Sequence, residues 1–260
     1  MPLWQIIVLA VIQGTTEFLP ISSDGHLVVA AALMAPSEAA NLEVSDLVIV
    51  LHGGTLLSIL VFYWQRILGL LRSDRRTIGL LVVATIPAVI VGLPAKLFAE
   101  RWLENPLLAG IFLIVTGIVL LVAARGGRGL ADYPALTYRQ ATLIGMAQAA
   151  AILPGLSRSG CTISTGLRIG LSPSAAATFS FLMAIPVIGG ACLLESAKLL
   201  RAGGLAMPLG HLAIGVVVSF VVGLVSLAWL VRWLERGRFA LFAWWCIPLG
   251  LAVLVWQLSK

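Results

Sequence analysis

The chain has 260 residues, of which 60% are hydrophobic and 11% are charged, and its mean hydropathy is +1.05. Soluble domains carry about 25% charged residues, so this composition excludes a soluble protein and indicates an integral membrane protein. The apolar runs are as long as helices and lack strand-like alternation, which argues against an outer-membrane barrel. The net charge of +6 does not indicate nucleic-acid binding, because the basic residues lie in short loops between apolar runs and serve as topology signals.

The first apolar segment, residues 3–35, is interrupted. It breaks at Pro20 and at the polar stretch SSDGH, residues 22–26. Each arm is too short to cross a bilayer, which requires about 20 apolar residues. We therefore expect a re-entrant pair of short helices whose polar tip lies at membrane depth. Irregular backbone is tolerated there only inside the protein or beside a water-filled cavity.

Six further runs are long enough to span the bilayer. They cover residues 44–64, 78–99, 106–124, 174–197, 207–231 and 239–258. Between the third and fourth runs, residues 138–172 are interrupted by LPGLSRSG at 153–160, which predicts a second re-entrant hairpin. The predicted fold is an all-α polytopic membrane protein, a single membrane domain over residues 1–260. It has about six transmembrane helices and two re-entrant helix hairpins.

Basic residues gather on one side of these spans. Eleven lie on one side and five on the other, with Arg158 in neither group. The eleven are Arg66, Arg72, Arg75, Arg76, Arg125, Arg128, Arg139, Arg168, Arg232, Arg236 and Arg238. Cytoplasmic loops are enriched in Lys and Arg, so this side is expected in the cytoplasm. The first hairpin then enters from the outer side and the second from the cytoplasmic side, so that their tips point at each other.

The two halves of the chain are weakly similar in sequence. EFLPISSDG can be aligned with AILPGLSRSG, which places Pro20 over Pro154 and Ser22 near Ser157. Together with the opposite orientation of the hairpins, this similarity predicts an inverted-topology repeat with halves of approximately 1–124 and 125–260. Paired interrupted segments in two such halves point to a site near the middle of the membrane.

Arg158 is the sharpest functional signal in the second hairpin. An arginine at membrane depth costs at least a few kcal/mol unless it is paired or hydrated. It could form a structural pair with Glu17, or it could clamp an anion, because its guanidinium matches phosphate geometry. Neighbouring residues would add backbone N–H groups and hydroxyls to an anion nest at a helix start. These residues are Gly155, Ser157, Ser159 and Gly160.

The first hairpin carries groups for acid, base and nucleophile chemistry. Gln13 and Glu17 are four residues apart and face one side of a helix. Glu17 could be a protonated structural group, or an ionised group that serves the chemistry. The pair could hold a divalent cation through oxygen ligands, weakly until substrate phosphates complete the site. Ser23 and His26 have an i, i+3 spacing, which permits contact within a helix.

Two further polar residues have structural interpretations. Asp24 is expected to be the N-cap of the arm that begins at Gly25. His52 lies within the first span and is expected to be a polar packing residue.

The two interrupted motifs resemble those of the undecaprenyl-diphosphate phosphatase family, the bacitracin-resistance proteins of bacterial inner membranes. The first family motif has Glu or Gln, then G-x-T-E-F-L-P, Ile or Val, S-S, Ser or Thr, and G-H. Here it is QGTTEFLPISSDGH at 13–26, and the second motif, P-G-x-S-R-S-G, is PGLSRSG at 154–160. Asp24 departs from the family pattern, which has Ser or Thr at that position.

The resemblance implies an integral membrane phosphatase. Such an enzyme removes the terminal phosphate of undecaprenyl diphosphate and returns the lipid carrier to cell-wall synthesis. It also implies an active site open to the outer side of the bacterial inner membrane, with Mg²⁺ or Ca²⁺ bound weakly or together with substrate. The residues carried over by position are Glu17, Ser23, His26 and Arg158 as catalytic, Gln13, Ser22, Ser157 and Ser159 as substrate-binding, and Glu17 as metal ligand. Gly160 joins the substrate-binding set as part of the expected anion nest.

Two mechanisms fit this set of residues. In the preferred one, Ser23 is the nucleophile and His26 is its base and then the general acid. Arg158 clamps the terminal phosphate while a cation bridges Glu17 and the diphosphate. In the other, His26 is the nucleophile and Glu17 activates it or the water.

The contrasting function is a transporter or flippase of an anionic prenyl-phosphate lipid, because inverted repeats with broken helices are also transporter architecture. The expected partners are a prenyl diphosphate lipid, the bilayer and, as an open alternative, a second copy of the chain in a homodimer. No nucleic acid is expected.

Overall fold

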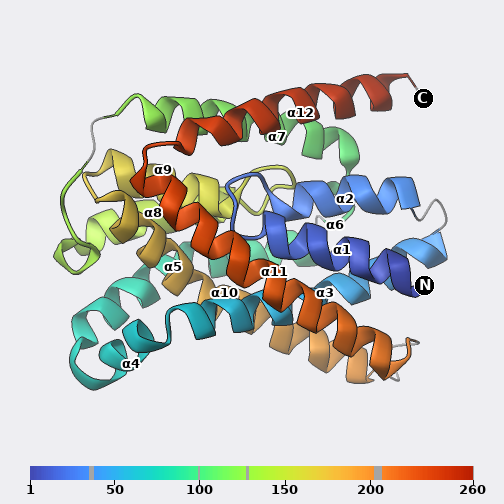
Figure 1. The fold of residues 1–260 in the computed structure, drawn as a ribbon, viewed down its shortest axis with the longest axis horizontal. Helices are drawn as coiled ribbons and strands as arrows, with labels where there is room; N and C mark the ends of the chain where they lie inside the picture. Colours follow the sequence, from blue (N-terminus) through green and yellow to red (C-terminus); the bar gives the residue numbers. More distant parts are fainter. Residues whose placement is uncertain (35–37, 99, 127–128, 202–206, 260) are drawn as a thin grey trace.

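The computed structural model describes residues 1–34, 38–98, 100–126, 129–201 and 207–259. Over these ranges the chain forms twelve α-helices and two short 3-10 helices (Figure 1). The α-helices are α1 (Leu3–Thr16), α2 (Ser23–Met34), α3 (Glu38–Phe62), α4 (Trp64–Ser73), α5 (Arg75–Phe98), α6 (Glu100–Leu103), α7 (Pro106–Ala124), α8 (Tyr138–Ala150), α9 (Arg158–Arg168), α10 (Pro173–Arg201), α11 (Leu209–Glu235) and α12 (Ala243–Leu258). The 3-10 helices are η1 (Tyr133–Ala135) and η2 (Phe239–Phe242).

Five of the six predicted spans are confirmed as single helices. Among the described residues, five stretches are long and apolar enough to cross a membrane, namely Arg75–Ala95, Pro106–Ala124, Pro173–Lys198, Leu209–Glu235 and Phe239–Leu258. A sixth is obtained if α3 and α4 count as one span, since Leu47–Phe62 and Trp64–Ser73 pass together but are bent by 69°. This bend differs from the prediction of an uninterrupted run at 44–64.

The two interrupted segments form hairpins of short helices, as predicted. The α1–α2 hairpin lies at the end of the molecule where both chain termini are found, and the α8–α9 hairpin lies at the opposite end (Figure 1). The turns of the two hairpins meet between these ends. The opposed arrangement thus agrees with the orientation predicted from the charges, while the repeat halves 1–124 and 125–260 stay a prediction.

Long helices hold the hairpins on several sides. Helix α1 packs against α11 and α3, and α8 packs against α5. The α5–α8 contact is close because Gly145 has no side chain: a Cβ there would lie 2.3 Å from the carbonyl oxygen of Ala84. Small residues allow such close approach of helices inside a bilayer, where apolar burial alone does not drive association.

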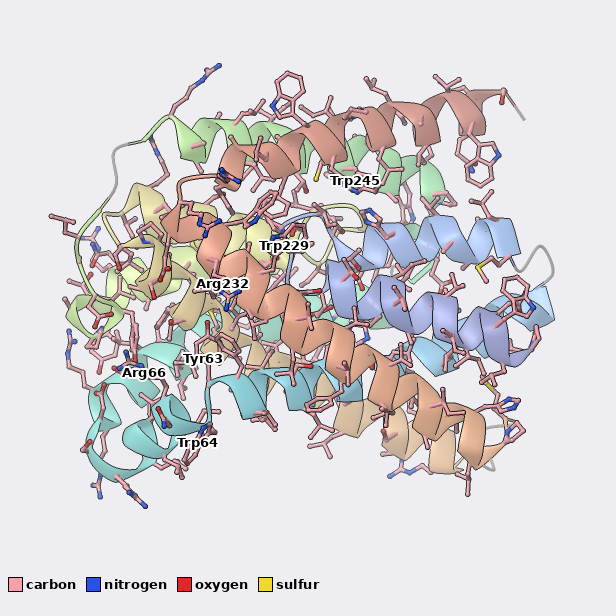
Figure 2. The ribbon with its side chains drawn as sticks, viewed as in Figure 1. Tyr63, Trp64, Arg66, Trp229, Arg232 and Trp245 are labelled. Atoms are coloured by element: carbon pink, nitrogen blue, oxygen red, sulfur yellow. The ribbon has the colours of Figure 1, made fainter. Side chains whose placement is uncertain are left out.

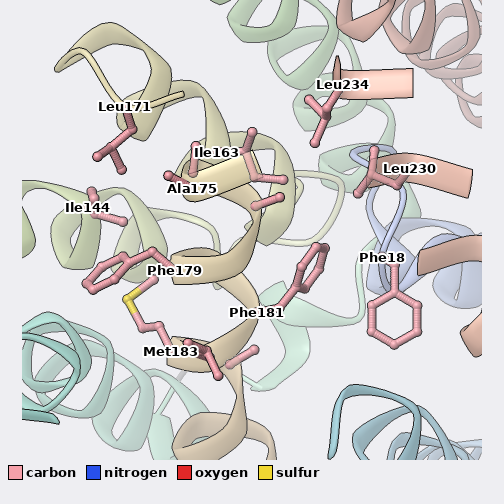
Figure 3. Close-up of a cluster of buried hydrophobic side chains, with 14 of the residues drawn as sticks. Phe18, Ile144, Ile163, Leu171, Ala175, Phe179, Phe181, Met183, Leu230 and Leu234 are labelled. Carbon is pink, nitrogen blue, oxygen red and sulfur yellow. The ribbon is translucent and has the colours of Figure 1, made fainter. Parts of the chain in front are cut away.

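The apolar core lies beside the hairpin turns. Figure 3 shows part of this cluster, in which α10 contributes the fully buried Phe179, Phe181 and Met183. Phe18, from the turn of the first hairpin, is also fully buried and meets the ring of Phe181 edge-on at 5.6 Å. The turn that carries Glu17 is therefore fixed by packing on its apolar side, and its polar side chains face the second hairpin.

Candidate active site

The first hairpin turns sharply between the end of α1 at Thr16 and the start of α2 at Ser23. Ser22 adopts a left-handed backbone conformation with φ of 71°, which is rare for a residue other than glycine. Its hydroxyl oxygen accepts a hydrogen bond from the backbone N–H of Gly25 at 3.2 Å. Ser22 therefore caps α2. The prediction for Asp24 is wrong, because Asp24 lies inside the first turn of α2, where a negative charge suits the helix dipole.

The second hairpin turns between Ala150 and the first residue of α9, Arg158. Ser157 is the N-cap of α9, and its hydroxyl oxygen accepts from the backbone N–H of Gly160 at 3.1 Å. Gly155 has φ of +87°, and a Cβ there would lie 2.1 Å from the carbonyl oxygen of Ala109 in α7. A glycine is thus required at this position both by its conformation and by the space available.

Thr116 of α7 fixes the second turn. Its hydroxyl donates to the carbonyl oxygen of Gly155 at 2.7 Å and accepts from the backbone N–H of Ser157 at 2.9 Å. All three groups are buried. One side chain from another helix therefore holds the backbone immediately before Arg158. No local pattern in the sequence marks Thr116 as part of the site.

The two hairpin turns contact each other directly. Arg158 donates from Nη2 to Oε1 of Glu17 at 2.6 Å, and the two side chains are only 17% and 5% exposed. The hydroxyl of Ser159 donates to the carbonyl oxygen of Leu19 at 3.2 Å. The structure therefore brings together the predicted acidic and basic groups, although they are 141 residues apart in the chain.

Glu17 is the centre of a buried hydrogen-bond network. Its Oε2 accepts from the hydroxyl of Ser23 at 2.8 Å and from Nε2 of Gln13 at 3.1 Å. The predicted one-sided arrangement of Gln13 and Glu17 on a helix is confirmed by this contact. Because the Ser23 hydroxyl donates its hydrogen bond to this carboxylate, Glu17 is placed to act as the base that removes the Ser23 proton.

His52 also faces Glu17, which the sequence analysis did not predict. Its Nε2 lies 3.5 Å from Oε2 of Glu17, while its Nδ1 is 2.8 Å from the carbonyl oxygen of Val48. The Nδ1 must carry a proton to bond that carbonyl. His52 is thus part of the site instead of a packing residue in the first span, because α3 crosses beside the turn of the first hairpin.

His26 has different partners from those predicted. Its Nδ1 lies 2.7 Å from the carbonyl oxygen of Ser22, and its Nε2 accepts from the indole N–H of Trp245 at 2.9 Å. These contacts select the neutral tautomer with the proton on Nδ1. The predicted role of His26 as base for Ser23 is not supported by this geometry, because the Ser23 hydroxyl bonds to Glu17. The helical twist of α2 directs the two side chains to different neighbours.

Two buried polar atoms of the site lack hydrogen-bond partners within the described chain, namely Nη1 of Arg158 and Oε1 of Gln13. Unpaired buried polar atoms are rare in folded proteins and call for an explanation. Here one is a cationic donor and the other a neutral acceptor. The first suits an anionic oxygen, and the second suits a cation or a water molecule.

The described residues contain no group of three or more His, Cys, Asp or Glu side chains that could hold a metal ion. Gln13 and Glu17 together offer one amide oxygen and one carboxylate on the same face of the first hairpin. This donor set suits Mg²⁺ or Ca²⁺ by ligand type but supplies fewer oxygens than either cation requires.

Comparison with known proteins identifies relatives over nearly the whole chain. The family described as "Bacitracin resistance protein BacA" matches residues 6–252. A protein of Rhodopirellula baltica, named undecaprenyl-diphosphatase, is 48% identical over 98% of this chain and 98% of its own length. Proteins with the same name from Corynebacterium glutamicum and Desulforudis audaxviator are each 39% identical, over 96% and 98% of this chain and 89% and 97% of their own lengths. Because these matches include both hairpins and every span, the chain belongs to the family of the bacitracin resistance protein BacA.

Proposed function

We propose that this protein hydrolyses undecaprenyl diphosphate to undecaprenyl phosphate and phosphate, and so recycles the lipid carrier for cell-wall synthesis in the bacterial membrane. Its relatives carry the name undecaprenyl-diphosphatase. The observation that carries the proposal is the buried contact between Arg158 and Glu17 at the meeting hairpins, with Nη1 of Arg158 still available. That arrangement places a phosphate clamp next to a hydroxyl and its base.

Arg158 is proposed to bind the terminal phosphate. One guanidinium nitrogen is held by Glu17, which fixes the orientation of the planar group. The other, Nη1, is left to donate to a phosphate oxygen. Arg158 also opens α9, whose dipole favours an anion at this end. Of its first-turn N–H groups, that of Gly160 is bonded to Ser157, which leaves those of Arg158 and Ser159 for the phosphate. These donors would stabilise negative charge on the equatorial oxygens of the transferring phosphate.

Ser23 is proposed as the nucleophile, with Glu17 as its base. The Ser23 proton passes to Glu17 as the serine oxygen bonds to the terminal phosphorus, and the bridging P–O bond breaks to release undecaprenyl phosphate. Water then attacks the phosphoserine, phosphate leaves, and the serine oxygen regains a proton. The hydrogen bond of 2.8 Å between the two side chains supports this assignment.

His26 stays the alternative nucleophile. The bond from its Nδ1 to Ser22 directs the lone pair of Nε2 outward, where the indole of Trp245 currently occupies it. An attack by Nε2 would require Trp245 to move away. In the preferred mechanism His26, partly exposed like Ser23, serves the leaving group.

A divalent cation is proposed to bind together with substrate. Gln13 and Glu17 would hold it, with phosphate oxygens and waters as further ligands. When bound, Mg²⁺ or Ca²⁺ would neutralise charge on the diphosphate. The dependence on substrate oxygens predicts weak binding to the free protein.

The orientation and the partners are proposed from charge and fold. The arginine-rich turns beside α4 and after α11 favour a cytoplasmic location for that end, so the α1–α2 hairpin would open to the outer side. The prenyl chain would remain in lipid between the spans. A homodimer and the absence of nucleic-acid binding stay predictions.

The test is phosphate release from undecaprenyl diphosphate by the purified protein in detergent, with and without a chelator. Wild type should release phosphate, and both the chelator and Arg158→Ala should abolish release. Movement of an anionic prenyl lipid across vesicles without any phosphate release would contradict the enzyme and support a transporter.

A further inference from the structure

A polar cavity lies at the bend between α3 and α4, away from the hairpin turns. Its volume is about 460 Å³. Figure 2 shows Tyr63, Trp64 and Arg66 at this bend. The cavity is lined by Phe62, Tyr63, Gln65, Arg66, Ser174, Thr178 and Val231. It therefore combines a guanidinium with an amide and several hydroxyl groups, all of which can donate hydrogen bonds to an anion.

Two groups in this cavity are available to an anionic ligand. The hydroxyl of Tyr63 is buried, in a residue only 6% exposed, and has no hydrogen-bond partner among the described residues. Arg66 forms no ion pair with any described side chain. Two carboxylates near this end, Asp74 and Asp132, are instead bonded to the neighbouring residues in the chain. Arg66 is exposed and free to bind a ligand, whereas the buried Tyr63 hydroxyl without a partner calls for an acceptor. The positive end of the α10 dipole at Pro173 adds to the attraction for an anion.

An apolar groove of about 470 Å³ adjoins the polar cavity. It lies between α4, α5 and α10 and is lined by Ile67, Leu70, Leu182 and their neighbours. The two concavities are linked along the chain: Arg66 lines one and Ile67 the other, and Thr178 and Leu182 are one turn apart on α10. A ligand with a charged head and a hydrocarbon tail would place each part in the matching concavity.

The setting of the cavity also favours a lipid. Trp64 is 55% exposed beside it, and exposed aromatic side chains are typical of the level at which lipid head groups lie. The cavity is separated from the active site. Tyr63 follows His52 by eleven positions, about 16 Å along a helix. Between the two regions the ring of Phe181 stacks on Tyr63 and meets Phe18 edge-on.

We propose that the polar cavity at Arg66 and the adjoining groove form a second binding site, for a lipid with a phosphate monoester head group. Arg66, Tyr63 and Thr178 bind the phosphate, and the groove beside α4 binds one hydrocarbon tail. The site lies at the arginine-rich end, and therefore on the side opposite the proposed opening of the active site. It is independent of the hydrolytic chemistry at Ser23.

The test uses the fluorescence of Trp64 in reconstituted vesicles. The vesicles consist of phosphatidylcholine with one added brominated lipid, either phosphatidic acid or phosphatidylcholine. Bromine atoms on the tails of the added lipid quench nearby tryptophan. The contribution of Trp64 is obtained by subtracting the quenching measured in Trp64→Phe from that measured in wild type. Brominated phosphatidic acid should quench Trp64 more than brominated phosphatidylcholine. The content of brominated phosphatidic acid that gives half of the maximal excess quenching should rise about tenfold in Arg66→Gln, because a charged hydrogen bond is lost.

Arg72→Gln is the matched control. Arg72 is exposed on the same helix but does not line the cavity, so this variant should behave as wild type. Arg66→Gln should keep normal phosphate release, which shows that it is folded. Equal quenching by the two brominated lipids, or equal loss in the two arginine variants, would overturn the proposal. Native mass spectrometry that finds an adduct with inorganic phosphate but none with phosphatidic acid would also overturn it.

Discussion

Thr116 should control catalysis from outside the site. Its hydroxyl both donates to the carbonyl of Gly155 and accepts from the N–H of Ser157. Thr116→Val keeps the shape but leaves these two buried backbone groups without partners. Each unpaired group costs about 1–3 kcal/mol, so the substitution should destabilise the native conformation of the second hairpin turn by about 2–6 kcal/mol.

The backbone can avoid part of this loss only by moving, and Arg158 is the next residue. A displacement of about 1 Å in a catalytic group lowers the rate about 10²-fold. We therefore expect kcat/KM for phosphate release to fall roughly 100-fold in Thr116→Val, with a lower thermal unfolding midpoint in detergent.

Thr85→Val is the matched control for this change. The hydroxyl of Thr85 donates only to the carbonyl of Leu81 within α5, so the same chemical change leaves no buried group without its helical partner. This variant should stay close to wild type in both assays. If Thr116→Val and Thr85→Val were indistinguishable, the proposed support of the second hairpin by α7 would be refuted.

Three other predictions concern single contacts. His52→Leu removes the partner of Glu17 and should lower kcat/KM for phosphate release about tenfold, or about 1.4 kcal/mol, whereas unchanged kinetics would exclude His52 from the site. Trp245→Phe removes the N–H bonded to His26 and should speed labelling of that histidine by diethyl pyrocarbonate; unaltered labelling would show that the bond does not shield the ring. Asp74 accepts two hydrogen bonds from Thr77, which lower the pKa of its carboxyl below the usual value of 3.8. The stabilisation should therefore be present above about pH 4 and be lost as the pH falls through the lowered pKa. Asp74→Ala should lower the thermal unfolding midpoint at pH 7 by an amount equivalent to about 0.5–1 kcal/mol, and it should have little effect in strong acid. An equally large loss in strong acid would contradict the role of the Asp74 carboxylate as a cap for the start of α5.

The membrane fold was largely predictable because its signals are local. Length and hydropathy define the spans, and breaks at Pro20 and at LPGLSRSG define the hairpins. The excess of arginines on one side predicted that the two hairpins are opposed, and hence that their turns meet. The bend after Phe62 was not predictable, since neither proline nor glycine marks it in the sequence.

The residues missed in the site depend on contacts between distant segments. His52 sits in a helix that the sequence marks only as apolar, and it reaches Glu17 because α3 passes the first hairpin. Trp245 reaches His26 across 219 positions of the chain. The capping role of Ser22 requires its left-handed backbone conformation, which nothing in the residue type indicates. Local patterns therefore identified the reactive groups, while their pairing required the tertiary structure.

The most direct test of the mechanism is to identify the phosphorylated residue in a single turnover. Purified protein is mixed with undecaprenyl diphosphate and quenched rapidly in acid and in alkali, because phosphoserine survives acid and phosphohistidine survives alkali. The peptide that carries the phosphate is then sequenced by mass spectrometry. The structure predicts an acid-stable phosphate on Ser23 that is absent in Ser23→Ala, together with loss of turnover in that variant. An alkali-stable phosphate on His26, or normal turnover by Ser23→Ala, would contradict the assignment of Ser23 and Glu17 as nucleophile and base.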